Sequence, residues 1–217
     1  MRKEIILLAA SRKHKNLCIA GIDRLTGEWI RIVSNDSTIS YAVNIDDVID
    51  KKGGKVPGIF DIVSIECSER LLNYYQSDNY VYASGRTWEI IGRARLQDVL
   101  RIHPIESLPY LFYNTDNKVH MDYLMALDEN EPKHSLALIR PTNIIVHVQQ
   151  WEKKRVKMSF NYNGVRYRYL TITDIDFEQR FLMMDVNDYT LNNALLVVSL
   201  GECYNDNHSK LVATIIE

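Results

Sequence analysis

The most informative segment of the chain reads Lys153-Lys154-Arg155-Val156-Lys157-Met158-Ser159-Phe160-Asn161-Tyr162-Asn163-Gly164-Val165-Arg166-Tyr167-Arg168-Tyr169-Leu170-Thr171-Ile172. At its centre lies Asn163-Gly164, the residue pair that most strongly favours a type I′ hairpin turn, because both turn residues must adopt positive φ. Aromatic and β-branched residues recur on both sides of this pair. The segment is therefore predicted to form two antiparallel strands joined by a two-residue turn.

The two faces of this hairpin differ in chemistry, because side chains alternate between the faces of a strand. The face predicted to meet the core pairs Tyr162 with Val165, Phe160 with Tyr167, Met158 with Tyr169 and Val156 with Thr171. The opposite face carries Arg155, Lys157, Ser159, Asn161, Arg166 and Arg168, with Leu170 as its one apolar member. The hairpin thus combines an apolar core face with a basic outer face.

The elements around the hairpin indicate its fold. A strand is predicted before it at 142–149, and an amphipathic helix after it at 175–183, capped by Thr173 or Asp174. Two further strands are predicted at 195–200 and 210–216. Three strands, a helix and two strands are the element order of an OB-fold, in which the second and third strands often form the ligand face.

The N-terminal half has the same plan without sequence identity to the second. Its predicted strands are 4–10, 17–22, 28–33, 60–67 and 80–91, with a short helix at 44–50 capped by Asn44. Two more helices are predicted at 96–101 and 121–127. We therefore expect a mainly β protein with two tandem OB-like five-stranded Greek-key barrels: a first barrel at 1–93, a helical connector at 94–131 and a second barrel at 132–217.

Composition restricts the class of protein. The longest apolar runs are far shorter than the roughly 20 residues needed to cross a bilayer, so no membrane partner is expected. Three widely spaced cysteines suggest a reduced, cytoplasmic setting. The net charge of −2 is low for a dedicated non-specific nucleic-acid binder, so the basic clusters are expected to contact a few phosphates and not to coat a long duplex.

Ten residues are candidates for contacts to nucleic acid or nucleotide: Arg12, Lys13, Trp29, Arg31, Arg155, Lys157, Arg166, Arg168, Tyr204 and Lys210. The cations would contact phosphates, and Trp29 and Tyr204 would stack on bases. Tyr162 and Tyr204, near turns, are expected to be exposed, Tyr167 and Tyr169 are expected in the core, and Lys210 at a barrel rim. The alternative for the basic residues is that they only solvate an outward face and blunt edge pairing.

Trp29 and Arg31 share one face of their strand, which leaves two interpretations. Either Trp29 stacks a base while Arg31 contacts a phosphate or base edge, or Trp29 faces the core and Arg31 forms a buried ion pair.

The sequence nominates no catalytic residue, metal site or cofactor. Cys203 and His208 lack the second pair of ligands that a structural zinc site needs. The glycines at 53 and 54 lack the phosphate-loop spacing, and Asp174 and Glu178 are explained by helix capping and the helix dipole. The six histidines are scattered, and none pairs in sequence with a serine or carboxylate.

Short blocks along the whole chain carry a resemblance to a known family. They are Ser11-Arg12-Lys13, Cys18-Ile19-Ala20-Gly21, Asp23, Thr26-Gly27-Glu28-Trp29-Ile30-Arg31, Asn79-Tyr80-Val81, Leu138-Ile139-Arg140, Phe160-Asn161-Tyr162-Asn163-Gly164, Ile172-Thr173-Asp174, Ser199-Leu200-Gly201-Glu202 and Lys210-Leu211-Val212-Ala213. In these blocks the chain resembles the bacterial dual OB-containing domain family, departing from it at Ile32 and Cys203, where proline is expected. The resemblance implies two OB units and a nucleic-acid or nucleotide ligand, and transfers no catalytic residues.

The hypothesis from sequence is a non-catalytic cytoplasmic module that binds single-stranded nucleic acid or a nucleotide through its OB faces, in a multi-protein defence or repair system. Two alternatives stay open. One is a protein-interaction scaffold that docks a partner enzyme, and the other is a nucleotide-processing enzyme with a site between the barrels.

Overall fold

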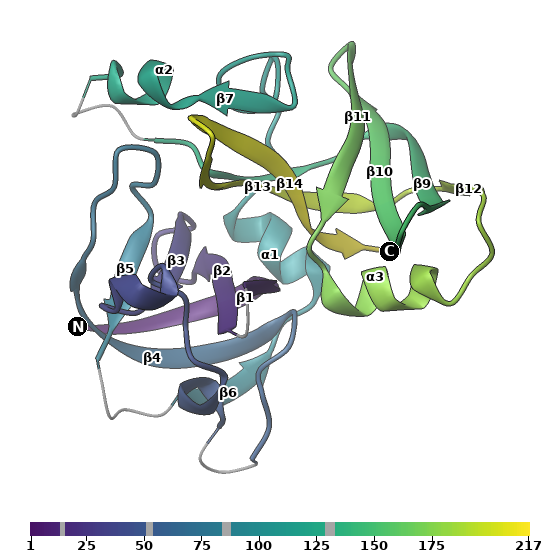
Figure 1. The fold of residues 1–217 in the computed structure, drawn as a ribbon. Helices are drawn as coiled ribbons and strands as arrows, with labels where there is room; N and C mark the ends of the chain where they lie inside the picture. The colour runs from purple at the N-terminus through teal and green to yellow at the C-terminus, as the bar shows by residue number, and fades with distance from the viewer. Residues whose placement is uncertain (14–15, 51–53, 84–87, 129–132) are drawn as a thin grey trace. The chain divides into compact units, whose positions relative to one another are not determined.

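The structure is a computed structural model of residues 1–217, and it describes all of them except 14–15, 51–53, 84–87 and 129–132. The fold is mostly β, as predicted. It divides into two compact units, Met1–Pro104 and Ile105–Glu217 (Figure 1). No helix in the described ranges has the length and apolar character that a bilayer crossing requires.

The first unit contains a closed five-stranded barrel. Its strands are β1 (Arg2–Lys13), β2 (Asn16–Asp23), β3 (Trp29–Val33), β4 (Asp61–Arg70) and β5 (Asn79–Tyr82). They pair in the order β1-β2-β3-β5-β4, and β4 pairs again with β1 to close the barrel. The β3–β5 pairing is parallel and the others are antiparallel, which is the strand order expected of an OB-fold.

Three shorter elements complete the first unit. They are the 3₁₀ helices η1 (Ser37–Ile39) and η2 (Ile45–Val48) and the strand β6 (Glu89–Arg93), which pairs with β4. Asn44 caps η2 as predicted, accepting the N–H of Asp46 at 3.0 Å. The strand predicted at 80–91 is instead two strands, β5 and β6; the positions 84–87 lie outside the described residues.

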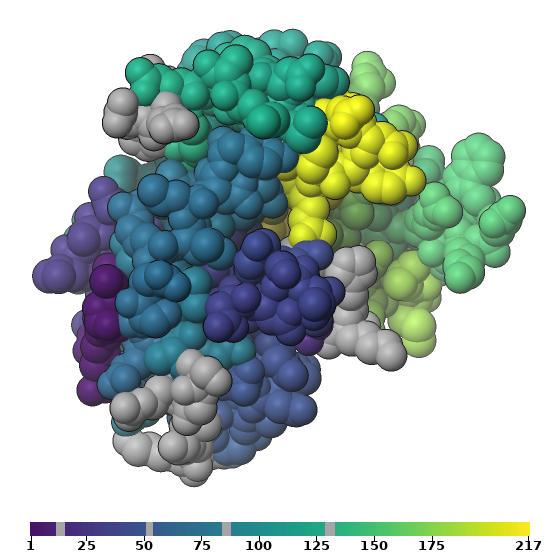
Figure 2. All heavy atoms as spheres, turned by 60° about the vertical axis from the view of Figure 1, so that its left-hand side comes forward, coloured from purple at the N-terminus to yellow at the C-terminus, as the bar shows by residue number. Residues whose placement is uncertain are grey.

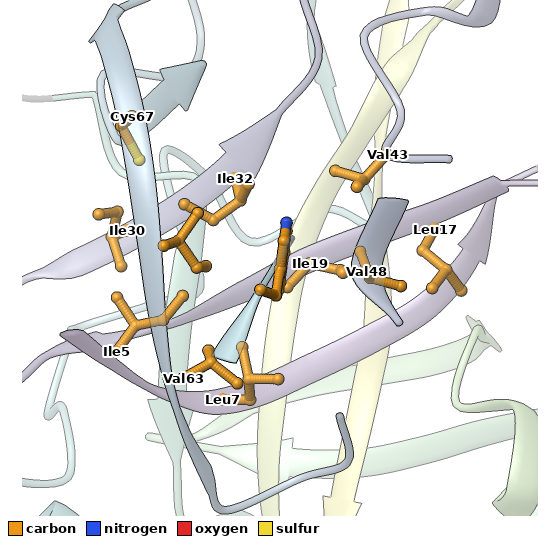
Figure 3. Close-up of a cluster of buried hydrophobic side chains, with 12 residues drawn as sticks. Ile5, Leu7, Leu17, Ile19, Ile30, Ile32, Val43, Val48, Val63 and Cys67 are labelled. Carbon is orange, nitrogen blue, oxygen red and sulfur yellow. The ribbon is translucent and has the colours of Figure 1, made fainter. Parts of the chain in front are cut away.

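Alternation along the strands builds the core of this barrel. Figure 3 shows Ile5, Leu7, Ile19, Ile30 and Ile32 directed towards one another from β1, β2 and β3. Trp88 is buried in the same cluster. Because Ile30 and Ile32 face inwards, the other side chains of β3 must lie on the outer face of the barrel.

The second unit repeats the OB strand order in a larger sheet. Its strands are β7 (Lys118–His120), β8 (Leu136–Ile139), β9 (Thr142–Gln150), β10 (Lys154–Tyr162), β11 (Val165–Ile172), β12 (Asp188–Leu191), β13 (Leu195–Tyr204) and β14 (Asn207–Ile216). The path β9-β10-β11-β14-β13 has the strand order of the first barrel, including a parallel β11–β14 contact. Among the described strands no β9–β13 pairing closes this path, so the second closed five-stranded barrel that was predicted is a sheet extended at both edges. β12 extends this path beside β9, β8 extends it beside β13, and β7 pairs with β14.

The helix α3 (Ile175–Leu182) follows β11, as predicted. Asp174 caps it by accepting the N–H of Phe177 at 3.1 Å. Its buried residues, Phe177 and Phe181, lie four positions apart and therefore on one helix face.

The register of the β10–β11 hairpin confirms the prediction near the turn and corrects it further away. Tyr162 pairs with Val165 and Phe160 with Tyr167, but Met158 pairs with Leu170. The cause is a β-bulge at Tyr169, whose φ is 56°. The extra residue reverses the faces beyond it, so Leu170 is buried and Tyr169 points outwards, the opposite of what strict alternation predicted.

The residues predicted as a helical connector are shared between the two units. The helices α1 (Leu96–Ile102) and α2 (Met121–Met125) form where helices were predicted, but the division falls after Pro104, so α1 belongs to the first unit. From Ile105 on, the chain covers the apolar face of the β10–β11 hairpin.

Tyrosine hydroxyls fasten this covering segment to the hairpin. The Tyr162 hydroxyl accepts the N–H of Leu108 at 2.7 Å and donates to the carbonyl of Glu106 at 2.9 Å. The Tyr167 hydroxyl accepts the N–H of Leu111 at 2.8 Å. Tyr162 is therefore buried, and the expectation that it is exposed was wrong, because chain from outside the barrel strands packs over it.

Candidate nucleic-acid interface

The outward side of the β10–β11 hairpin is the candidate interface, and we call it the hairpin outer face. Its residues are Arg155, Lys157 and Asn161 of β10 and Arg166, Arg168, Tyr169 and Thr171 of β11. Arg155, Arg168 and Tyr169 are exposed, while Lys157 and Arg166 are half-buried. Within the described residues, no ion pair involves any of the four cations. Four of the predicted binding residues thus share one face.

Arg155 and Lys157 repel one another at the start of β10. Burial lowers the pKa of the Lys157 ammonium, the positive charge of Arg155 lowers it further, and Glu178 opposes both effects. The Lys157 Nζ also donates to Thr171 Oγ1 at 2.6 Å, which directs the ammonium across the hairpin. An anion placed here would relieve the repulsion between the two cations.

Arg166 is held in place by its neighbours near the turn. Its Nη1 donates to the carbonyl of Asn143 at 2.8 Å and to Asn161 Oδ1 at 3.1 Å. A guanidinium has five N–H donors, so donors remain for a ligand. The backbone of Arg168 is fixed as well, because its carbonyl accepts a hydrogen bond from Asn117 Nδ2 at 2.6 Å.

One exposed aromatic residue that the sequence did not nominate lies on this face, and another lies in the loop that precedes β10. Tyr169 is 51% exposed, and Trp151 is exposed in the loop between β9 and β10. Strict alternation placed Tyr169 in the core, and no sequence signal marked the bulge that turns it outwards. The exposure of Trp151 could have been predicted from the sequence, because this residue lies in a loop shortly before the basic residues Lys153 and Arg155.

Arg31 does not reach a ligand-accessible surface. It is 7% exposed, and its Nε lies 3.5 Å from Asp78 Oδ2. Trp29 lies on the same outer face of β3, half-buried, with its ring 5.3 Å from that of His103 in a T-shaped arrangement. The buried ion pair is the alternative that holds for Arg31, but Trp29 contacts the residue that follows α1 and not the barrel core.

Lys210 is a second buried cation, so its predicted place at a barrel rim was wrong. It is 1% exposed, and its Nζ donates to the carbonyl of Asn114 at 2.6 Å and to Asn114 Oδ1 at 2.9 Å. The Nζ also lies 5.2 Å from the centre of the Tyr167 ring. Burial lowers the pKa of Lys210 to about 7, and the negative charge of Asp116 opposes the shift. Lys210 is buried because β7 pairs with β14 and brings residues 114–117 over it.

The remaining candidates do not join the hairpin outer face. Tyr204 is exposed as predicted, but it lies at the β13–β14 turn, whose β14 side pairs with β7 (Figure 1). Figure 2 shows this C-terminal part of the chain, in yellow, reaching the surface. Arg12 and Lys13 lie in β1, opposite Leu17 and Asn16, but their side chains are outside the described part of the structure.

One comparison with known proteins identifies a family. The family model described as "dual OB-containing domain" matches residues 3–215. No curated protein and no solved structure matches the chain significantly. The family match spans both units, each of which has the OB strand order. The chain therefore belongs to the dual OB-containing domain family.

Proposed function

We propose that this protein is a non-catalytic module that binds single-stranded nucleic acid or a nucleotide on the hairpin outer face of its second unit. The observation that carries the proposal is the gathering of four cations and an exposed tyrosine on one side of β10 and β11. These are the second and third strands of the OB order, where such folds often bind their ligands.

Electrostatics limits the size of this interface. The net charge of −2 and the four cations favour binding to a few phosphates of a short segment. Glu178 acts on Lys157 of β10, and Asp188 lies on β12 beside β9, and these two acidic groups would disfavour a long polyanion. A bacterial, cytoplasmic, multi-protein defence or repair system is the setting that we propose for this activity.

A direct test is the salt dependence of oligonucleotide binding. We expect a labelled single strand of roughly 12 nucleotides to bind more weakly as salt rises. The double variant Arg155→Glu/Arg168→Glu should weaken binding at least about tenfold. It should also reduce the salt slope by roughly one for each phosphate that the variant no longer binds.

The matched control is Arg24→Glu/Arg101→Glu, which makes the same change of charge at exposed arginines of the first unit. Among the described residues, each of these arginines forms an exposed ion pair, so folding should be little affected. Equal loss of affinity in both double variants would contradict the proposal, as would binding that does not respond to salt.

A second candidate function, protein docking, is favoured by exposed apolar side chains at one end of the second unit. Trp151, Met183 and Val186 are all exposed, and the Lys154 Nζ donates to the carbonyl of Met184, which brings their segments together. Such side chains often mark protein contacts. Substituting Trp151 and Met183 with serine would abolish co-purification of a partner protein under this alternative and leave oligonucleotide affinity within about threefold, since neither residue carries a phosphate-binding charge.

A further inference from the structure

A chain of hydrogen bonds beside the hairpin outer face links three residues from three strands. His147 Nδ1 lies 2.7 Å from Asp188 Oδ1, and His147 Nε2 lies 2.8 Å from Ser159 Oγ. His147 is paired with Asp188 of β12 on one side and with Lys157 of β10 on the other. No pattern in the sequence indicates this arrangement, because the three residues meet only when β9, β10 and β12 pair.

The chain ends at the bulge residue Tyr169. Ser159 Oγ accepts the N–H of Tyr169 at 2.9 Å, which stabilises a backbone whose positive φ is unfavourable for a tyrosine. The Tyr169 ring lies 4.6 Å from the His147 ring, tilted by 42°. Ser159 thus holds the backbone of Tyr169, and His147, which is bonded to Asp188, packs against its ring.

The connectivity is that of a Ser-His-Asp triad, but the environment does not suit a nucleophile. Ser159 is 2% exposed, so a substrate carbonyl has no approach to its hydroxyl. The hydroxyl already accepts a hydrogen bond from the N–H of Tyr169 and forms another with His147. These groups suit a positioning role.

We infer that Tyr169 is the platform on which one unpaired nucleobase stacks, and that Asp188, His147 and Ser159 are the residues that position it. The inference rests on the proposed function and specifies its ligand: a strand with at least one base that is not paired. One side of the tyrosine ring meets His147, and half of the side chain is open to solvent beside Arg168. A stacked base would therefore have its phosphates next to the cations of the hairpin outer face.

The experiment compares a normal single strand with an abasic strand of equal length, so that phosphates are kept and bases removed. Tyr169→Ala should weaken binding of the normal strand about tenfold, leave the abasic strand unchanged and keep the salt slope, since stacking contributes independently of charge. Tyr169→Phe should bind within about twofold of the wild type. A duplex of the same sequence should bind Tyr169→Ala and wild type equally.

The positioning role is tested with Ser159→Ala and, should that variant not fold, with Asp188→Ala at the exposed end of the chain of hydrogen bonds. Each should lower the affinity for the normal strand several-fold relative to the abasic strand. A merely structural role would lower both affinities equally, and the loss of the Asp188 charge by itself would raise both equally.

One outcome overturns the inference while the proposed function stands: Tyr169→Ala binding the normal strand like the wild type. Covalent labelling of Ser159 by a fluorophosphonate would overturn both the positioning role and the non-catalytic character of the module. Failure of the wild-type protein to bind any strand would overturn both proposals. Both proposals are supported if Arg155→Glu/Arg168→Glu weakens binding of the normal and the abasic strand, while Tyr169→Ala weakens binding of the normal strand alone.

Discussion

The hairpins β2–β3 and β10–β11 hold the same place in the two OB strand orders, but the outer face of the first is covered and that of the second is exposed. In the first unit, Arg31 is paired with Asp78 and Trp29 packs against His103. In the second unit, Arg155, Arg168 and Tyr169 are exposed. Strand order therefore provides a candidate ligand face, and the chain that packs over that face decides whether a ligand can reach it.

The covering segments explain the difference. In the first unit, α1 ends beside the β2–β3 turn, where the ring of His103 lies 2.8 Å from the carbonyl of Gly27. In the second unit, residues 106–114, which lie outside the five strands of the OB order, cover the apolar side of the hairpin and not its outer side. The outer face of β10–β11 is left to solvent.

The largest effect that separates the two faces should come from Asp78→Ala. It would leave the guanidinium of Arg31 buried without its carboxylate, which costs about 3 kcal/mol or more. We expect a matching fall in the free energy of unfolding, measured by urea denaturation. Arg168→Ala, at the equivalent open face, should change stability by less than about 0.5 kcal/mol. Similar losses in both variants would show that the two faces are equally buried.

Glycines near the two hairpin turns offer a smaller, matched comparison. Gly27 and Gly164 both have positive φ, 72° and 82°. A Cβ added at Gly27 would lie 2.3 Å from the carbonyl oxygen of Ile102, whereas a Cβ added at Gly164 would meet no atom within 4 Å. Gly164→Ala should therefore cost only the backbone strain, about 1 kcal/mol. Gly27→Ala should cost about 2 kcal/mol or more, because the backbone at Ile102 must also shift. Equal changes in melting temperature for the two variants would contradict the conclusion that the chain at Ile102 covers the β2–β3 turn.

The buried cations of the two units should differ in their response to pH. An arginine such as Arg31 keeps its charge across the accessible pH range, whereas burial lowers the pKa of Lys210 from 10.5 to about 7. Between these pH values the unfolded chain binds a proton that the folded chain has released, so stability rises with pH, by at most about 1.4 kcal/mol per pH unit. Lys210→Met should remove this rise between roughly pH 7.5 and 8.5, measured by chemical denaturation. A slope that persists in the variant would assign it to another group.

Local features of the fold were predictable because each depends on residues close in sequence. The Asn163-Gly164 turn forms with both residues at positive φ, and the caps at Asn44 and Asp174 form as predicted. The strand–helix–strand order of both OB units follows from composition and alternation. Six of the ten candidate residues lie exposed or half-buried at the surface: Trp29, Arg155, Lys157, Arg166, Arg168 and Tyr204.

The wrong predictions concern residues whose partners are distant in sequence. Lys210 is buried because Asn114 folds over it, and Tyr162 because the backbone around Leu108 does. Tyr169 turned outwards through a bulge that depends on Ser159. Alternation predicts faces only while the pairing has no extra residue.

The sequence by itself determined the family, the element order and the existence of a hairpin with one basic side, since these depend on local propensity and period. Only the tertiary structure decided which OB unit keeps its outer face open, because that depends on where α1 and residues 106–114 pack. It also assembled Asp188, His147, Ser159 and Tyr169, which come from four strands and share no pattern along the chain. Strand pairing and burial are long-range effects, and they select which of the residues available in the sequence reach a ligand.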